Sequence, residues 1–250
     1  MAIISVAMGC DPVKKDQAKE DNKEFAAFLQ KYYDERMQLY PIEATANGDN
    51  RFNDLLPADF TDSYRSKLKE FFEDYKSALA KMDAEQMNDN DKASYDIFKY
   101  EMETTLEGLT HHYMGGSAIA DNSYIPFDQF NGLPLLMGQM GGGTGNQPFK
   151  TVQDYDNWLK RATAFSAWTD SAIVYFKKGM AANYVLPKAL VVKMIPQMQA
   201  MVTDSATKSL FYEPIKLMPA SFSEADKSRL TAAYIDLIQQ HIVPSYKHLA

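Results

Sequence analysis

Four histidines and one cysteine are the side chains of this sequence best suited to bind a metal or to act as a nucleophile. His111 and His112 follow an expected helix, and adjacent side chains on an extended chain point to opposite sides, so this pair is poorly placed to share one ion. His241 falls on the apolar phase of the last expected helix, which favours a hydrogen-bonded core histidine. No H-E-x-x-H pattern, which places two zinc-binding histidines on one helix face, occurs. We therefore expect no metal site and no catalytic residue within this stretch.

Two further stretches resemble ligand-binding loops but lack residues that such loops require. The glycine-rich run 138–145 is followed by Asn146, whereas a phosphate-binding loop continues with Lys and then Ser or Thr. The stretch 88–91 begins like a calcium loop, but the glycine and the glutamate needed further on are missing. We interpret it as a turn in which Asn90 or Asp91 caps the next helix.

Cys10 is the single cysteine, which excludes an intramolecular disulfide and a multi-cysteine zinc site. An apolar run ending in Ala7-Met8-Gly9 precedes it and resembles the lipobox of a bacterial lipoprotein signal peptide, whose cysteine carries the lipid. Since no charged side chain precedes Cys10, we expect the leader to be incomplete. Residues 1–10 are predicted to be a signal-peptide remnant and the polar residues 11–23 a tether to the membrane. The alternative is a buried strand or helix start with an incidental cysteine.

The composition is that of a globular chain able to bury a core. Its 250 residues are 46% hydrophobic and 24% charged, and the net charge is −7. This acidic balance argues against a nucleic-acid-binding surface. No apolar run approaches the roughly 20 residues that span a bilayer. If Cys10 is lipidated, we expect the protein in the bacterial cell envelope, on the periplasmic or the outer-membrane face.

Apolar residues recur at helical spacing along most of the chain, so we expect an all-α fold. The pattern predicts a helical domain over 24–250, arranged as an irregular multi-helix array without a solenoid repeat. The expected helices cover about 25–40, 61–82, 91–109, 151–178, 188–201 and 223–241.

Residues 110–150 are rich in glycine and proline and show no helical period, so they are predicted to form one long loop, with room for a short strand. We expect 124–136 to be ordered, because leaving their apolar side chains in water is unfavourable, and 138–146 to be mobile. Tyr124, Asp128, Gln129 and Asn131 are the candidate cleft-lining residues of this loop. The alternative is that they only satisfy the backbone of the loop.

Five segments, taken in order, resemble a bacterial family, the domain-of-unknown-function family numbered 885. They are Tyr40-Pro41 to Gly48, Asp128 to Gly132, Pro148 to Arg161, Gly179 to Pro187 and Ile242 to Leu249. In the fourth segment Asn183 stands where the family has a second glycine. Asparagine also tolerates the left-handed conformation that ends a helix, so the difference is mild.

The resemblance implies a mostly helical, often secreted or lipid-anchored protein of the zincin metallopeptidase type. The family's H-E-x-x-H helix lies downstream of the last matched segment, so zinc is expected for the full-length protein and not in this stretch. The chain would then be the N-terminal, cleft-forming part of an enzyme that acts on peptides. The alternative is a SusD-like lipoprotein that binds glycans and catalyses no reaction, for which we would expect paired-helix repeats.

Overall fold

A computed structural model describes residues 20–113, 115, 120 and 122–250. Helices dominate this part of the chain and no β-strand occurs in it, which confirms the predicted all-α class. Within the same residues, no helix combines the length and the apolar character needed to cross a membrane. Cys10 and most of the expected tether lie outside the described residues, and the first helix begins at Lys23.

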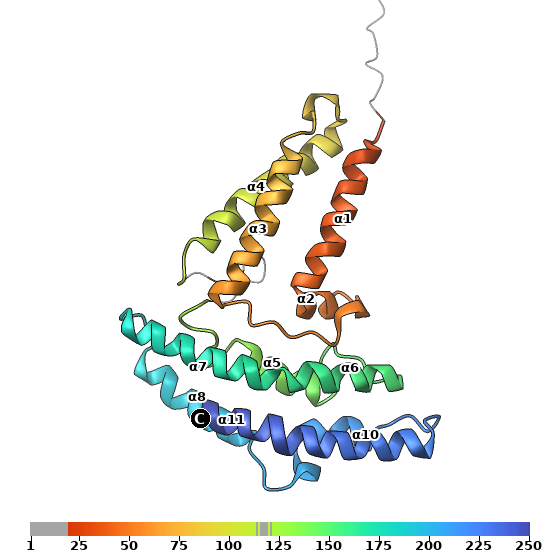
Figure 1. Cartoon of the computed structure of the whole chain (residues 1–250), viewed down its shortest axis with the longest axis vertical. Helices are drawn as coiled ribbons and strands as arrows, with labels where there is room; N and C mark the ends of the chain where they lie inside the picture. Colours follow the sequence, from red (N-terminus) through yellow and green to blue (C-terminus); the bar gives the residue numbers. More distant parts are fainter. Residues whose placement is uncertain (1–19, 114, 116–119, 121) are drawn as a thin grey trace, which may run out of the picture.

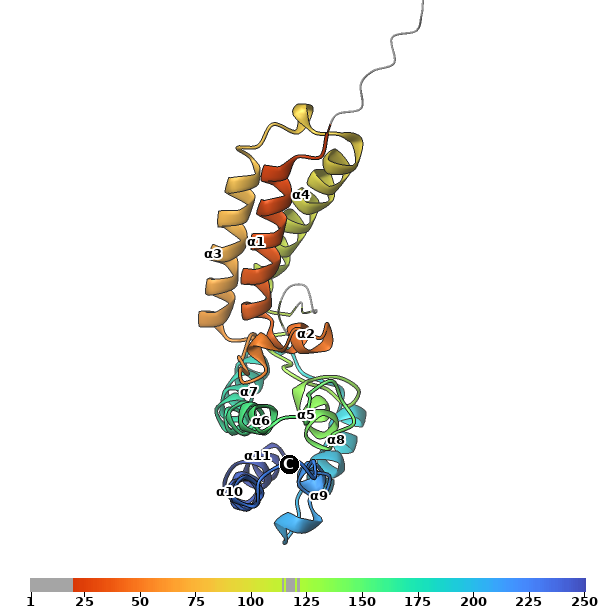
Figure 2. The same cartoon turned by 90° about the vertical axis from the view of Figure 1, so that its right-hand side faces the viewer.

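Three long helices form an upper unit with its own core. They are α1 (Lys23–Leu39), α3 (Asp62–Leu79) and α4 (Asp89–Leu109), and both views show them side by side (Figures 1 and 2). The buried side chains of α3 recur every three or four residues, as an amphipathic helix requires: Arg65, Leu68, Phe72, Tyr75 and Leu79. Helix α4 is capped by the Asn88 side chain, which accepts from Asp91 N at 2.8 Å. The cap is therefore neither Asn90 nor Asp91, because the helix already begins at Asp89.

The lower unit is built from two rows of helices below the upper unit (Figures 1 and 2). The upper row contains α5 (Leu133–Gly141), α6 (Val152–Thr163) and α7 (Phe165–Ala181). The lower row contains α8 (Lys188–Ala200), α10 (Glu224–Leu237) and α11 (Val243–Leu249), the last two joined by a π-helix at Ile238–Ile242. The second core lies between the rows and includes the fully buried rings of Trp158, Phe165, Phe211 and Tyr246.

Short elements connect these helices. Helix α2 (Pro41–Ala46) follows α1 directly, and α9 (Glu213–Lys216) precedes α10. Single 3₁₀ turns occupy Asn50–Phe52, Ala84–Gln86, Ala206–Lys208 and Leu210–Tyr212.

The glycine-rich segment is not one continuous loop, because α5 occupies its centre. Gly138 and Gly141 belong to this helix and are buried, so the expectation that 138–146 is mobile is wrong for its first half. A Cβ on Gly141 would come within 2.6 Å of Trp158 Cζ2 and would clash with Phe211. The glycines are therefore needed for close packing of α5 on the second core rather than for flexibility.

Two predicted helix ends are confirmed. Thr151 caps α6 in a capping box, in which its hydroxyl accepts from Asp154 N and the Asp154 carboxylate accepts from Thr151 N. Asn183 has φ 57° after α7, and Tyr184 N donates to Gly179 O at 2.8 Å. This is the left-handed helix ending that the asparagine was expected to allow.

Candidate functional site

A groove of about 520 Å³ lies where the two units meet. One wall comes from the α1–α2 junction and from the segment 56–59, and the other comes from residues 130–139 with Trp168 of α7. Its apolar lining consists mainly of Leu39, Ile42, Leu56, Pro57, Leu133, Leu135 and Leu136. Pockets that bind small molecules or peptides are typically apolar with a few polar groups, and this groove fits that description.

The first wall is shaped by the sequence Tyr40-Pro41. Tyr40 ends α1 with φ −122° and ψ 62°, and Pro41 starts α2, a position where its missing N–H costs no helical hydrogen bond. The chain therefore turns sharply between the two helices. Burial raises the pKa of Tyr40 well above its ordinary value, so its hydroxyl stays neutral at physiological pH.

Arg161 of α6 holds this wall from beneath. Its guanidinium is fully buried and donates five hydrogen bonds of 2.7 to 3.2 Å, all to uncharged acceptors. The acceptors are the carbonyls of Pro41, Phe52 and Leu55, the Thr45 hydroxyl and the Gln147 side chain. Burial lowers the pKa of Arg161 to about 10, so the group is still charged at neutral pH. Arg161 thus fixes residues 41–55 onto the lower unit.

The second wall begins with a tight turn. Asp128 Oδ1 accepts from Phe130 N at 2.6 Å and from Asn131 N at 2.9 Å, while Asp128 N donates to Asn131 O. Gly132 follows with φ 117°, and a Cβ there would clash with Phe127. This turn places Phe130, 70% exposed, and Asn131 at the groove.

The structure separates the four candidate cleft residues. Asn131 lines the groove, whereas the Asp128 carboxylate is used by the turn backbone. Gln129 contributes its main-chain carbonyl, which accepts from Gln197 Nε2 at 3.2 Å. Tyr124 lies elsewhere, with its ring 5.4 Å from that of His112 and 6.0 Å from that of Tyr184.

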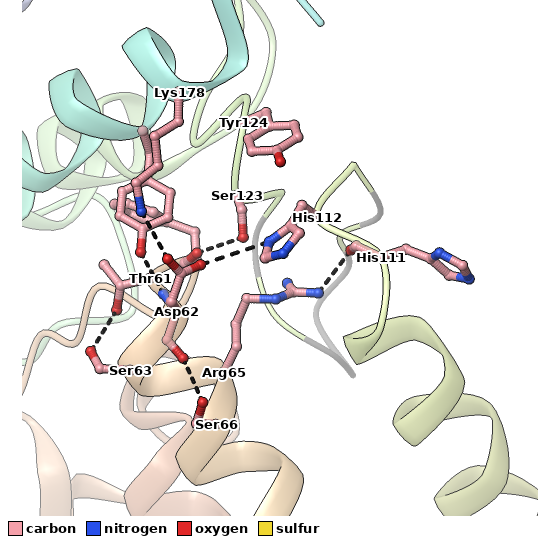
Figure 3. A network of polar contacts seen from close by, with 12 residues as sticks. Thr61, Asp62, Ser63, Arg65, Ser66, His111, His112, Ser123, Tyr124 and Lys178 are labelled. Atoms are coloured by element: carbon pink, nitrogen blue, oxygen red, sulfur yellow. Dashed lines mark hydrogen bonds and ion pairs between the residues drawn. The ribbon is translucent and has the colours of Figure 1, made fainter. Parts of the chain in front are cut away.

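A second polar cluster surrounds Asp62 at the start of α3 (Figure 3). Lys178 Nζ of α7 donates to Asp62 Oδ2 at 2.8 Å, and Asp62 N donates to the Tyr175 hydroxyl at 2.6 Å. Partial burial would raise the pKa of the Asp62 carboxyl, but hydrogen bonds from Lys178 and Tyr175 outweigh it and hold the pKa below its ordinary value. The cluster links the upper unit to the lower one.

The two adjacent histidines point apart, although the chain forms a turn at residues 112–113 rather than an extended segment. His112 Nδ1 lies 3.8 Å from Asp62 Oδ1, whereas the His111 ring points away from Asp62 (Figure 3). His241 is half-buried in the π-helix and lies 3.2 Å from Ser166 Oγ. Across the described ranges, no three His, Cys, Asp or Glu side chains gather as metal ligands would. These residues therefore do not fit a catalytic zinc, which needs about three protein ligands.

Sequence reasoning missed most of the groove. Asp59, Leu56 and Trp168 line it but belong to no pattern that marks a site. Arg161 could have been found, because it lies on the same face of α6 as Trp158, three residues earlier. A charged side chain on a buried face predicts a structural or functional role.

Four of the family-like segments contribute to this region. The first two form opposite walls of the groove, and the third supplies Arg161. In the last segment the buried Tyr246 hydroxyl donates to Pro134 O at 2.6 Å, which fixes the start of α5. Two of these segments therefore line the groove, and the other two hold Pro41 and Pro134 of its walls through hydrogen bonds.

Comparisons with known proteins agree with this pattern. The family model described as "Bacterial protein of unknown function (DUF885)" matches residues 41–250, which confirms the resemblance expected from the five segments. The crystal structure of a predicted lipoprotein from Colwellia psychrerythraea has a similar fold, with a TM-score of 0.68 at 15% identity. The similarity covers 90% of this chain but 40% of that one, so this chain spans well under half the length of that protein. No curated protein sequence matches this chain.

Proposed function

This chain belongs to the bacterial DUF885 family, and on that premise we propose that it is the N-terminal, cleft-forming part of an envelope-anchored zinc metallopeptidase-like protein that acts on peptides. The observation that carries the proposal is the groove, because two family-like segments separated by about 80 residues of sequence form its opposite walls. In this proposal the groove binds part of the peptide, and the zinc ligands lie beyond residue 250. The zinc would polarise the scissile carbonyl and activate water when bound.

Two features support a peptide ligand. The lining is mainly aliphatic, which suits peptide side chains, and Asn131 and Gln139 offer amide groups that can pair with a peptide backbone. A glycan-binding surface would need several exposed aromatic rings, whereas Phe130 is the one exposed aromatic residue among the described residues of the groove lining, and Tyr40 and Trp168 are 7% and 2% exposed. The SusD-like alternative is therefore the less favoured of the two.

The envelope location is part of the same proposal. It rests on the lipobox-like sequence before Cys10 and on the fold shared with the Colwellia protein. A lipid on Cys10 would hold the domain at a membrane through the polar residues that follow.

Zinc analysis of the full-length gene product tests the proposal. We expect about one zinc per full-length molecule by elemental analysis and none retained by residues 1–250 alone, because catalytic zinc needs about three protein ligands. Zinc held tightly by this chain, or a full-length protein without any zinc site, would refute it.

A further inference from the structure

The outer face of α8 is apolar although it is exposed. This helix buries Met194 and Met198 in the second core, and the side chains that it turns away from the core are mostly apolar. They are Val191, Val192, Ile195 and Pro196, of which the first three are 39%, 52% and 36% exposed. We call these four residues the α8 face, and Lys188 and Gln199 lie at its two ends. A surface helix normally presents polar residues to solvent, so an apolar outer face marks an interaction surface.

The family-like segment from Gly179 to Pro187, which does not line the groove, sets the direction of α8. A Cβ at Gly179 would lie 2.9 Å from the Tyr124 carbonyl oxygen, so the end of α7 packs closely on that residue. Asn183 then turns the chain with its left-handed φ, and Pro187 directly precedes α8. A segment that resembles the family therefore orients a helix whose outer face the described part of the chain leaves exposed.

The occupant that best fits this face is the part of the full-length protein that follows residue 250. The last described helix, α11, packs on α8, and both views show the end of the chain beside α8 (Figures 1 and 2). The fold shared with the Colwellia protein covers 40% of that chain, so more than half of that chain has no counterpart here. Residues that continue from α11 would reach the α8 face without a long connection.

We infer that the α8 face is the docking surface of a helical segment that follows residue 250 in the full-length protein. This segment packs an apolar stripe of its own on Val191, Val192 and Ile195. The inference depends on the part of the proposed function that places further residues beyond residue 250. The contact ties the C-terminal part to the lower unit, which also supplies the α5 wall of the groove, and so holds the zinc-binding part in place relative to the groove.

Cysteine labelling of residues 1–250 and of the full-length protein tests the inference. Val192→Cys is made in both proteins together with Cys10→Ala, and the rate of maleimide labelling is read by mass spectrometry on the peptide that contains residue 192. We expect labelling to be about tenfold slower in the full-length protein, because a thiol under a docked segment reacts only when that segment opens. Ile97→Cys is the matched control, since Ile97 is 68% exposed on α4 in the upper unit and should react equally in the two proteins.

Thermal stability gives a second measurement. Val192→Asp should lower the Tm of the full-length protein by about 3 °C or more and leave that of residues 1–250 unchanged, because only the full-length protein buries the new carboxylate. Ile97→Asp should change the Tm of both proteins equally.

The outcomes separate this inference from the proposed function. Fast labelling at residue 192 in a full-length protein that holds zinc would overturn the inference and leave the proposed function standing. Slow labelling in residues 1–250 alone that becomes faster on dilution would show a second copy on the α8 face and would also overturn the inference. A full-length protein without zinc would refute the proposed function whatever the labelling shows.

Discussion

At the scale of a single residue, the buried guanidinium of Arg161 holds residues 41–55, which include part of one groove wall, against the lower unit. Replacing it with leucine would remove five buried hydrogen bonds and take the side-chain donor from the Leu55 carbonyl and from the Gln147 side-chain oxygen, and each unsatisfied buried acceptor costs about 1–3 kcal/mol. We predict that Arg161→Leu lowers the free energy of unfolding by about 3 kcal/mol or more, measured by urea denaturation. Arg229→Leu is the matched control, because Arg229 is half-exposed and pairs with Asp156 on the surface. It should cost less than about 1 kcal/mol. Equal losses in the two variants would contradict this role of Arg161.

Asp128 and Asn131 differ in role although they belong to one turn. Asp128→Ala removes the acceptor of two backbone N–H groups and should lower stability by about 1 kcal/mol, with a lower Tm. Asn131→Ala should leave Tm unchanged and reduce kcat/KM of the full-length protein for peptides, because the side chain lines the groove. Normal turnover in Asn131→Ala, or an unchanged Tm in Asp128→Ala, would contradict these assignments.

Among the elements, the ion pair between α3 and α7 should make their association depend on pH. The Asp62 pKa is lowered in the folded state, so its contribution to stability is fully present above the unfolded pKa and is lost as pH falls through the folded pKa. A double-mutant cycle with Asp62→Asn and Lys178→Met should give a coupling of about 0.5 kcal/mol at pH 7 and close to zero near pH 2. A coupling that does not change with pH would rule out this ion pair as its source.

The long helices were predictable because each buries one face in a single core. Thr151 and Asn183 also marked helix ends, since their hydrogen-bonding and conformational preferences act locally. Helix α5 was not predicted, because Gly138 and Gly141 look like loop residues in the sequence. These two glycines allow close packing against Phe211 and Met201, which lie about 60 to 70 residues away in the sequence, and no local pattern reveals such contacts.

At the scale of the whole molecule, the groove forms only where the two units pack together, so the sequence predicted only part of its lining. Asn131 was a candidate, but Asp59 and Trp168 join it only when the two units pack together. Tyr124 was grouped with Asn131 by sequence proximity, whereas the fold places it beside His112 and Tyr184. Residues that share a loop need not share a site.

Anchoring is also a property of the whole protein. We predict that Cys10 carries a lipid, because a glycine and a polar tether flank it as in lipoprotein precursors. Cells expressing the full-length precursor and fed radiolabelled palmitate should label the wild type and not Cys10→Ala. Equal labelling of the two proteins would refute the prediction.

Peptide hydrolysis by the full-length protein tests the central claim most directly. A fluorogenic peptide with aliphatic side chains at its core should be cleaved, the activity should disappear with a zinc chelator, and added zinc should restore it. Residues 1–250 alone should show no cleavage under the same conditions. Cleavage that is insensitive to the chelator, or full activity in residues 1–250, would contradict the account.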